Sequence, residues 1–462
     1  MKRNIRAIAA LLSMLMLITA FAGCGKNDSS SGSKDGKKTI ELDGAQKKWA
    51  SMFGEDYVAE RAEYEKANPP YNVPDELKGT TVKFATWIDH TKTEAKYPMA
   101  NFSKVTGINV EWVEIPSSGY IEKIASMVAA GDAPDVYVEN NQTYPTTLTL
   151  STPLNKVKSI DMKDPIWDKG YFDFTTFGGN TYQCNTRNSV WQTVYLYFYN
   201  KKVYDENGLK TPADYMEEGT WNYENYVNSV RSFKELGGSF TGGTLTPEAL
   251  SLMYGSAIVY MKDGHFVSGL KDEALKTGYS RYLSLVDDGL MGGAEAAVMK
   301  GTAAGIITDS YGLKNSGYFA GIDAETLGYA TIPVDDDADT KVASHYRAYG
   351  IVKGAKNAEG AGYFLRFFLD PYNYNWDEIF LDESAKEFYL KNCADIKFEN
   401  KSFAFHRSMT RLMGYTGYDG IYKWDSILKT ANSNQLNTAL DSISNEVNSS
   451  IKKANELIDS LS

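Results

Sequence analysis

Aromatic and polar side chains that could bind a hydroxylated ligand follow two predicted strands of this chain. Trp87, Asp89 and His90 come directly after the first strand, and Asn140 and Asn141 come directly after a later one. Amides donate and accept hydrogen bonds, as hydroxyl groups do, and an indole ring adds a flat apolar face. Turn chemistry would also explain the asparagines, and Trp87 could instead cap the core. Both loops are therefore candidate binding loops.

A regular alternation of strands and helices positions these loops. The sequence predicts a strand, a helix, a strand, a helix and a strand, at 81–87, 97–105, 108–115, 118–131 and 135–139. Gly107 and Gly131 stand where the two helices should end. Short connections of this kind build an open, mostly parallel sheet that binds ligands beyond the carboxyl ends of its strands. Both candidate loops should lie at that edge.

Motifs for covalent, phosphate or metal chemistry are missing from the sequence. It has neither a Gly-x-Ser-x-Gly nucleophile elbow nor a Gly-x-x-x-x-Gly-Lys-Ser/Thr phosphate loop. The four histidines lie far apart, and none stands at metal-ligand spacing from a cysteine or another histidine. The acidic run at 335–339 lacks the glycine and terminal glutamate of an EF-hand, so a solvated loop explains it. We expect no cofactor and no metal.

The first 24 residues have the pattern of a secretory signal. Basic residues in the first six precede an apolar stretch over 7–22, which is shorter than the roughly 20 residues needed to cross a bilayer core. The junction FAGC at 21–24 resembles a bacterial lipobox. We expect a signal peptide at 1–23 and acylation, including palmitate, at Cys24. Two or more acyl chains would anchor the protein stably at the outer face of the cell membrane.

Two segments should separate the anchor from the first strand. Residues 24–38 predict a flexible tether, because 25–38 have no apolar side chain. Residues 39–78 predict a helical leader. Its helix should cover 45–67 and end before Pro69, because proline cannot continue a helix.

Size and composition bound the rest of the chain. More than 400 residues exceed a single core, so at least two domains are expected. Loss of 1–23 removes three positive charges and no negative one, which changes the formal net charge from −11 to −14 and argues against nucleic-acid binding. Cys184 and Cys393 could pair or stay buried. Apolar residues at three- and four-residue steps over 433–461 predict an amphipathic helix that packs on the body.

Seven segments spread over the chain form a recognisable series. They are TVKFATW at 81–87, FSKVTGINVEW at 102–112, AAGDAPDV at 129–136, LYFYNKKVYDENGL at 196–209, TWNYENYVNSVRSFKEL at 220–236, GTAAGIITDSYG at 301–312 and YGIVKGAKNAEGAGYFLRFFLD at 349–370. In this order they resemble the extracellular solute-binding proteins of carbohydrate ABC transporters. The order of the segments carries the resemblance, since no single segment is decisive.

The resemblance implies a two-lobe, periplasmic-binding-protein-like α/β fold with a ligand cleft between the lobes. Each lobe would be an open, mostly parallel sheet flanked by helices, and strands would cross between the lobes more than once. We place lobe one at 79–190 and 300–346, and lobe two at 191–299 and 347–462. The implied function is capture of an extracellular carbohydrate, an oligosaccharide, by a monomer that delivers it to an ABC permease without a catalytic step.

The resemblance also adds candidate ligand residues. Trp191 lies near the expected crossing between lobes. Asp309 and Tyr311 stand where many family members have a small residue and a sugar-stacking tryptophan. Tyr346 and Arg347 stand where glycines are common, so they could line the cleft or only fill it. Arg347 could hold hydroxyl groups or the carboxylate of an acidic sugar.

Two other function classes remain open at this point. A membrane-anchored glycan-processing enzyme needs only two facing carboxylates, which could be hidden among 59 acidic residues. A binding lipoprotein for a peptide or another non-sugar cargo could have the same fold, because a fold does not establish a function. Titration with sugars and peptides separates these alternatives.

Overall fold

The computed structural model describes residues 42–89, 99–140, 142–237, 247–335 and 340–462. The predicted signal peptide, Cys24 and the tether lie outside the described residues, as do His90, Asn141 and most of the acidic run. Residues Asp43–Ser462 form one compact unit. Within the described ranges, no helix is both long enough and apolar enough to span a membrane.

The predicted leader helix is confirmed as two helices, α2 (Gly44–Phe53) and α3 (Glu55–Ala67). They are separated by Gly54, whose φ of 88° suits a residue without a side chain. The leader packs on the body. The Arg61 guanidinium donates to both oxygens of the Asp370 carboxylate, at 2.7 and 2.6 Å. The Trp49 ring stacks on that of Tyr372, with centroids 4.6 Å apart.

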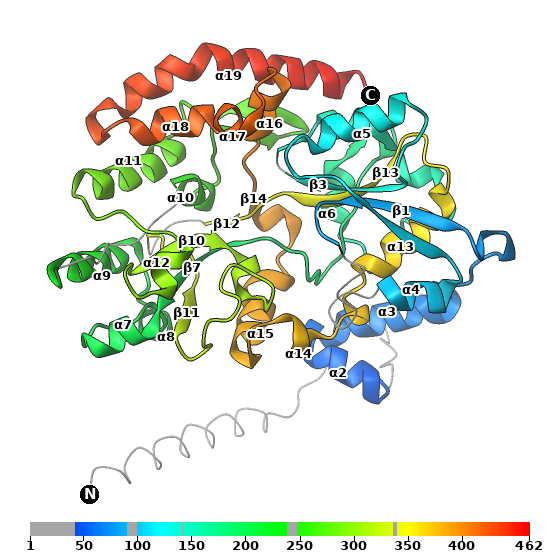
Figure 1. Ribbon diagram of the computed structural model, residues 1–462, viewed down its shortest axis with the longest axis horizontal. Coiled ribbons are helices and arrows are strands. Elements are labelled where there is room, and N and C mark those ends of the chain that lie inside the picture. The colour runs from blue at the N-terminus through cyan, green and yellow to red at the C-terminus, as the bar shows by residue number, and fades with distance from the viewer. Residues whose placement is uncertain (1–41, 90–98, 141, 238–246, 336–339) are drawn as a thin grey trace, which may run out of the picture. The chain divides into compact units, whose positions relative to one another are not determined.

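The first sheet has five strands in the order β2-β1-β3-β13-β4. Figure 1 labels three of them, β1, β3 and β13. Its strands are β1 (Thr81–Thr86), β2 (Asn109–Glu114), β3 (Val136–Asn140), β4 (Ser151–Thr152) and β13 (Arg347–Val352). β1 is parallel to β2 and β3, while β13 is antiparallel to β3 and β4. This confirms the strands predicted over 81–139. The glycines after the intervening helices, Gly107 and Gly131, have φ of 73° and 72°, as predicted helix stops should.

Helices cover both faces of this sheet and bury its central strands on both sides. α5 (Tyr120–Ala129) packs on one face, where Ile121 and Ile124 meet Ala85. α4 (Met99–Thr106) and α13 (Ala358–Leu369) pack together, and the Phe364 ring lies 5.2 Å from that of Phe84. Successive side chains of a strand point to opposite faces, so neighbouring residues of β1 face different helices.

The second sheet has three strands in the order β10-β7-β11. These are β7 (Tyr195–Asn200), β10 (Gly305–Asp309) and β11 (Leu327–Ala330), and both pairs are antiparallel. The expectation of a mostly parallel sheet is wrong for this sheet, because β10 and β11 both run in the direction opposite to β7. The helices between β7 and β10 are α7 (Lys201–Glu206), α8 (Pro212–Glu217), α9 (Tyr223–Glu235), α10 (Pro247–Met253), α11 (Glu273–Asp287) and α12 (Glu295–Met299).

Strand pairing differs from the expected partition of the chain. β10 and β11 pair with β7, which adds 305–330 to the second sheet. β13 pairs with β3, which adds 347–352 to the first sheet. The two segments are therefore exchanged relative to the expected lobes. The α/β architecture itself is as predicted, since helices flank both sheets.

Extended segments cross between the sheets side by side. Cys184 and Tyr349 form a two-way bridge with N···O distances of 2.9 Å, and the His345 N–H donates to the Thr193 carbonyl at 2.8 Å. A third segment joins them where the Ser344 N–H donates to the Ser402 carbonyl at 3.0 Å. Short strands complete this region: β5 (Thr176–Phe177), β6 (Asn180–Thr181), β8 (Val259–Lys262), β9 (His265–Ser268), β12 (Val342–Ala343) and β14 (Lys401–Ser402).

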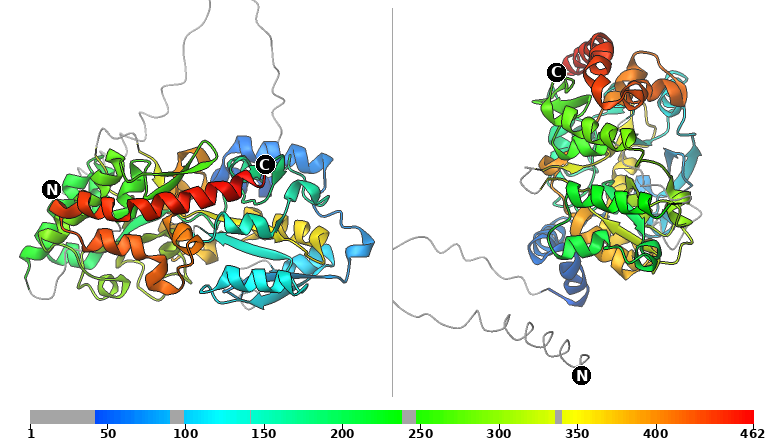
Figure 2. Two further views of the ribbon diagram at one scale, coloured as in Figure 1. Left: turned by 90° about the horizontal axis from the view of Figure 1, so that it is seen from above. Right: turned by 90° about the vertical axis from the view of Figure 1, so that its left-hand side faces the viewer.

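The predicted C-terminal helix is confirmed as α19 (Leu436–Asp459), and it packs on the body. It lies against α16 (His406–Leu412) and α18 (Lys423–Thr430), as Figure 2 shows. Its apolar stripe is buried at Leu436, Leu440, Ile443, Val447, Ala454 and Ile458. The remaining helices are α6 (Lys169–Phe174), α14 (Trp376–Ile379), α15 (Glu383–Tyr389) and α17 (Gly417–Ile421). Cys184 and Cys393 are both buried and unpaired.

Candidate functional site

A cavity of about 170 Å³ lies where the first and second sheets meet. Its walls come from the end of β1, the start of β13, the end of β10 and the segment before β7. The lining residues are Trp87, Ile88, Trp191, Gln192, Thr193, Asp309, Tyr311, Lys314, Tyr318 and Arg347. Five of them were predicted from the sequence, and the fold brings these five together from four separate segments.

The first sheet contributes Trp87 and Arg347. Trp87 directly follows β1, and its ring packs edge-to-face on Tyr120, with centroids 5.3 Å apart. Tyr120 is fixed in turn by donating its hydroxyl to the Ala85 carbonyl at 2.7 Å. Arg347 opens β13, opposite Asn140 at the end of β3. Its guanidinium carbon lies 6.0 Å from the centroid of the Trp87 ring. The strand ends thus place an aromatic face beside a cation.

The second sheet contributes Asp309, Tyr311 and Tyr318. Asp309 ends β10 and caps the 3₁₀ turn Ser310–Leu313, where its carboxylate accepts the Tyr311 N–H at 2.9 Å. The other oxygen accepts the Tyr318 hydroxyl at 2.9 Å. The two tyrosine rings meet edge-to-face, with centroids 5.4 Å apart. Burial and the neighbouring Asp309 charge raise the pKa of Tyr318, so it stays a neutral donor.

The crossing segment contributes Trp191, and Lys314 lies against it. The Trp191 ring stacks on Phe368 with centroids 5.6 Å apart, and its N–H donates to the Tyr374 hydroxyl at 3.2 Å. It is only 7% exposed, so packing accounts for most of its surface. The Lys314 ammonium donates to the Val190 carbonyl and lies 4.8 Å from the Trp191 ring centroid. Burial lowers the pKa of Lys314 to about 7.

Three described candidates do not line the cavity. Asp89 follows the lining residue Ile88, and Asn140 pairs with Arg347 across the two strands. The Asn140 side chain accepts the Gln142 N–H at 2.9 Å, which is the turn chemistry considered for it. Tyr346 is fully buried and donates its hydroxyl to Gln183 at 2.7 Å. A side chain without exposure cannot contact a ligand, so the prediction that Tyr346 binds the ligand is wrong. It precedes Arg347 in an extended segment, where neighbouring side chains face opposite ways.

Sequence reasoning missed Lys314 and Tyr318. An isolated lysine or tyrosine in a loop has no motif of its own, and the only available signal was its closeness to Asp309 and Tyr311. Gln192 and Thr193, next to Trp191, were missed for the same reason. The turn after β10 folds these residues back toward the crossing segment.

A buried charged cluster elsewhere fits an ion-pair network better than a metal. Side-chain ligand atoms of Glu248, His406 and Asp425 lie within 4.8 Å of one another. Arg407 pairs with Glu248 at 2.5 Å, and His406 pairs with Asp425 at 2.8 Å. Burial alone would raise the pKa of Asp425, but His406 and Arg407 hold it well below its usual value. Both carboxylates therefore already have partners within the protein.

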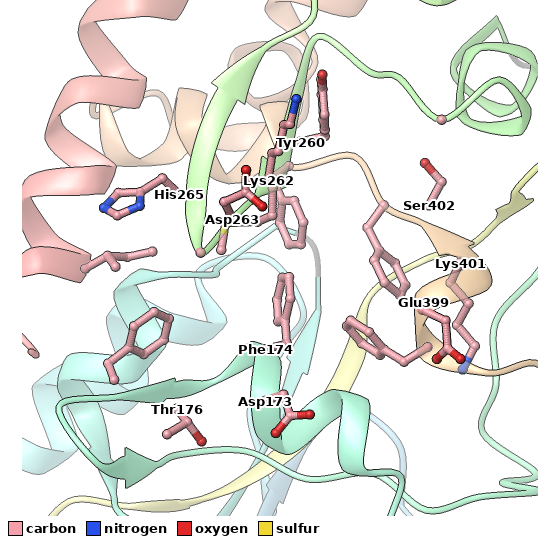
Figure 3. Close-up of a pocket in the computed structure, with 18 of the residues that line it drawn as sticks. Asp173, Phe174, Thr176, Tyr260, Lys262, Asp263, His265, Glu399, Lys401 and Ser402 are labelled. Atoms are coloured by element: carbon pink, nitrogen blue, oxygen red, sulfur yellow. The ribbon is translucent and has the colours of Figure 1, made fainter.

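A larger cavity of about 480 Å³ contains none of the predicted ligand residues (Figure 3). Phe174 points into it from α6, and Asp173, Lys262 and Asp263 lie around it with exposed side chains. It is not built from the strand ends of the two sheets. We therefore take the smaller cavity as the candidate site.

The sequence matches one protein family, and the fold is similar to that of several solved structures. The family model described as bacterial extracellular solute-binding protein matches residues 80–373. Similar solved structures include the cyclic alpha-maltosyl-1,6-maltose binding protein of Arthrobacter globiformis, with a TM-score of 0.61 and 14% identity over 81% of this chain and 99% of that one. No curated protein matches the sequence.

Two further solved structures share the fold. One is the galacto-N-biose/lacto-N-biose I-binding protein of Bifidobacterium longum, with a TM-score of 0.60 and 13% identity over 83% of this chain and 99% of that one. The other is UgpB of Mycobacterium tuberculosis in complex with glycerophosphocholine. It has a TM-score of 0.61 and 14% identity over 81% of this chain and 99% of that one. At such identities the likeness shows the fold alone.

Proposed function

Because this chain belongs to the bacterial extracellular solute-binding proteins, we propose that it captures an extracellular oligosaccharide and delivers it to the permease of an ABC importer. The observation that carries this proposal is the cavity between the two sheets. It combines the rings of Trp87, Trp191 and Tyr311 with the polar groups of Asp309 and Arg347. Sugars present C–H faces to such rings and hydroxyl groups to such polar partners.

Capture would couple to closure of the two lobes. Each sheet supplies part of the wall, and extended segments connect the sheets, so a ligand that contacts both walls favours the closed arrangement. The cavity is smaller than the roughly 300–1,000 Å³ that encloses a whole small ligand. An oligosaccharide would therefore place one unit inside and extend its other units outward.

A glycan-processing enzyme is not favoured. Glycosidases need two carboxylates facing the scissile bond, at roughly 5–9.5 Å from each other. Among the described lining residues, Asp309 is the single carboxylate, and it is engaged by Tyr311 and Tyr318. The matched family and the similar structures are binding proteins. The proposed role has no covalent step.

A ligand screen tests this proposal. The purified protein is heated with neutral and acidic oligosaccharides and with peptides, and each positive mixture is analysed for breakdown products. A ligand at about 100 times its Kd adds roughly 2.7 kcal/mol, which gives a shift of several degrees for this size of protein. We expect a shift with an oligosaccharide that remains intact. Shifts from peptides alone would refute the sugar assignment, and sugar cleavage would replace binding by catalysis.

The proposed location is the outer face of the cell membrane, with a lipid anchor on Cys24. The support is the signal-like pattern at 1–23 and the FAGC junction. Expression in a bacterium followed by detergent phase partition tests it. The wild-type protein should enter the detergent phase and Cys24→Ala should not, whereas equal partition would contradict the anchor. Light scattering of the purified protein should give the mass of a monomer.

A further inference from the structure

Arg347 differs from the other arginines that the structure describes. Eight arginines lie in the described ranges, and seven of them form an ion pair with Asp or Glu. Arg347 forms none with a described residue, although it lines a cavity and is partly buried. A guanidinium has five N–H donors in a planar fork that matches a carboxylate. An unpaired fork at a ligand cavity indicates an anionic group on the ligand.

Lys314 adds a second basic side chain to the same cavity. Its side chain is buried, and its ammonium donates to the Val190 carbonyl, with no carboxylate ion partner among the described residues. Asp309, the single carboxylate among the described lining residues, is already engaged by the Tyr311 N–H and the Tyr318 hydroxyl. Two basic side chains and one committed carboxylate therefore line the described part of the cavity. Partly buried cations gain from an added negative charge, because their own solvation is incomplete.

We infer that the ligand of this cavity is an acidic saccharide, whose oxyanion binds to the guanidinium of Arg347 and the ammonium of Lys314. This inference rests on the proposed function, since it names the class of sugar for the same site. Trp87 and Tyr311 would cover the apolar faces of the sugar ring that bears the charge. The oxyanion can come from the carboxylate of a uronic acid or from a sulfate ester, and the experiment separates these two sources.

Matched oligosaccharides test the inference by calorimetric titration at constant ionic strength. Each pair differs only at C6 of the sugar, as in digalacturonate against galactobiose or a glucuronate-containing disaccharide against its glucose counterpart. A third set has a sulfate ester on the neutral sugar. We expect the acidic member to bind at least about tenfold more tightly, because charge-assisted bidentate hydrogen bonds are roughly twice as strong as neutral ones. The tighter set identifies the oxyanion.

Substitutions assign the effect to the cations. Arg347→Gln should weaken binding of the acidic member far more than binding of the neutral member, and so remove the preference for the acidic one. Arg347→Lys keeps the positive charge and loses the planar set of guanidinium donors, so it should keep part of the preference for the acidic member. The matched control is Arg231→Gln, which removes an exposed arginine of α9 that pairs with Asp288 at the end of α11 and does not line the cavity. Melting of each unliganded variant shows whether it is folded.

Proton uptake gives an independent readout from Lys314. The groups that face its ammonium are Arg347, Asp309 and Cys393, with the rings of Trp191, Tyr311 and Tyr389. With a pKa of about 7, Lys314 is partly deprotonated at pH 7–8, and a bound oxyanion would favour its charged form. Titration in buffers of different ionisation enthalpy should show proton uptake with acidic sugars and none with neutral ones. Lys314→Met should abolish the uptake.

The outcomes distinguish this inference from the proposed function. Equal or tighter binding of neutral members, or an acidic preference that survives Arg347→Gln in a folded variant, overturns the acidic assignment and leaves oligosaccharide capture standing. Binding of peptides with no binding of any saccharide overturns both. A preference for uronates or sulfated sugars that disappears with Arg347→Gln, together with proton uptake that requires Lys314, supports the inference.

Discussion

The guanidinium carbon of Arg347 lies 6.0 Å from the ring centroid of Trp87, although the two residues come from opposite parts of the chain. β1 and β13 both pair with β3, one on each side. The end of β1 and the start of β13 therefore lie at the same end of the first sheet. The register of these strands therefore fixes the positions of the Arg347 guanidinium and the Trp87 ring. A ligand group that contacts both side chains meets a preformed wall.

Trp87→Ala should weaken ligand binding while the protein stays folded. The indole supplies an apolar face at the cavity, and aromatic contacts contribute about 0.5–1.5 kcal/mol beyond the area they bury. We expect a loss of tenfold or more in affinity for the oligosaccharide found in the screen, measured by calorimetry. Trp112→Ala is the control, because Trp112 lies in β2 and does not line the cavity. Equal effects of both substitutions would refute a ligand role for Trp87.

Gly317→Ala should displace the loop that holds Tyr311 and Tyr318. A Cβ at Gly317 would lie 1.9 Å from the Tyr311 carbonyl oxygen, so the backbone must shift. We expect destabilisation of about 1–3 kcal/mol together with weaker ligand binding. Gly44→Ala, where a Cβ would meet nothing within 4 Å, is the control. Denaturant titration and calorimetry measure the two effects, and unchanged binding would mean that this loop does not contact the ligand.

Glu139 should make stability fall as the pH rises. Burial raises the pKa of this carboxyl to about 7, above its ordinary value of 4.5. Between these values the folded state keeps a proton that the unfolded state has lost. The free energy of unfolding should therefore drop by about 1.4 kcal/mol per pH unit from this group.

Glu139→Gln isolates this contribution. The amide keeps a polar group of similar shape beside Thr143 and Gln183 but cannot ionise. Chemical denaturation at several values between pH 5 and pH 7 should give a flatter profile for the variant than for the wild type. Identical slopes would show that Glu139 titrates normally in the folded protein.

Asp370→Ala should detach the leader helices and strongly destabilise the protein. This carboxylate pairs with both Arg61 in α3 and Arg366 in α13, and its removal takes the most buried carboxylate partner from both cations. Breaking such a buried pair costs roughly 3–5 kcal/mol. Asp288→Ala breaks an exposed pair with Arg231 and should cost about 1 kcal/mol at most. Urea denaturation compares them, and a similar small loss for both would show that the leader is not anchored by Asp370.

Local pattern was enough to predict the elements that surround the site. The strands that end near Trp87 and Asn140, and the glycine stops at Gly107 and Gly131, follow from periodicity and backbone preferences within a few residues. The amphipathic helix at the C-terminus followed in the same way. The order of similar segments then indicated Trp191, Asp309, Tyr311 and Arg347 as ligand candidates, and all four line the cavity.

The sequence by itself determined the α/β pattern, the leader helix and most of the aromatic candidates, because these depend on neighbours along the chain. Only the tertiary structure decided the pairing of β10 with β7 and of β13 with β3, since hydrogen bonds between distant strands have no local signal. It also decided that Tyr346 is buried while Arg347 faces the cavity, and that Lys314 joins it. Which face of a strand meets the ligand is fixed by packing between distant segments, and the residue types alone do not specify that packing.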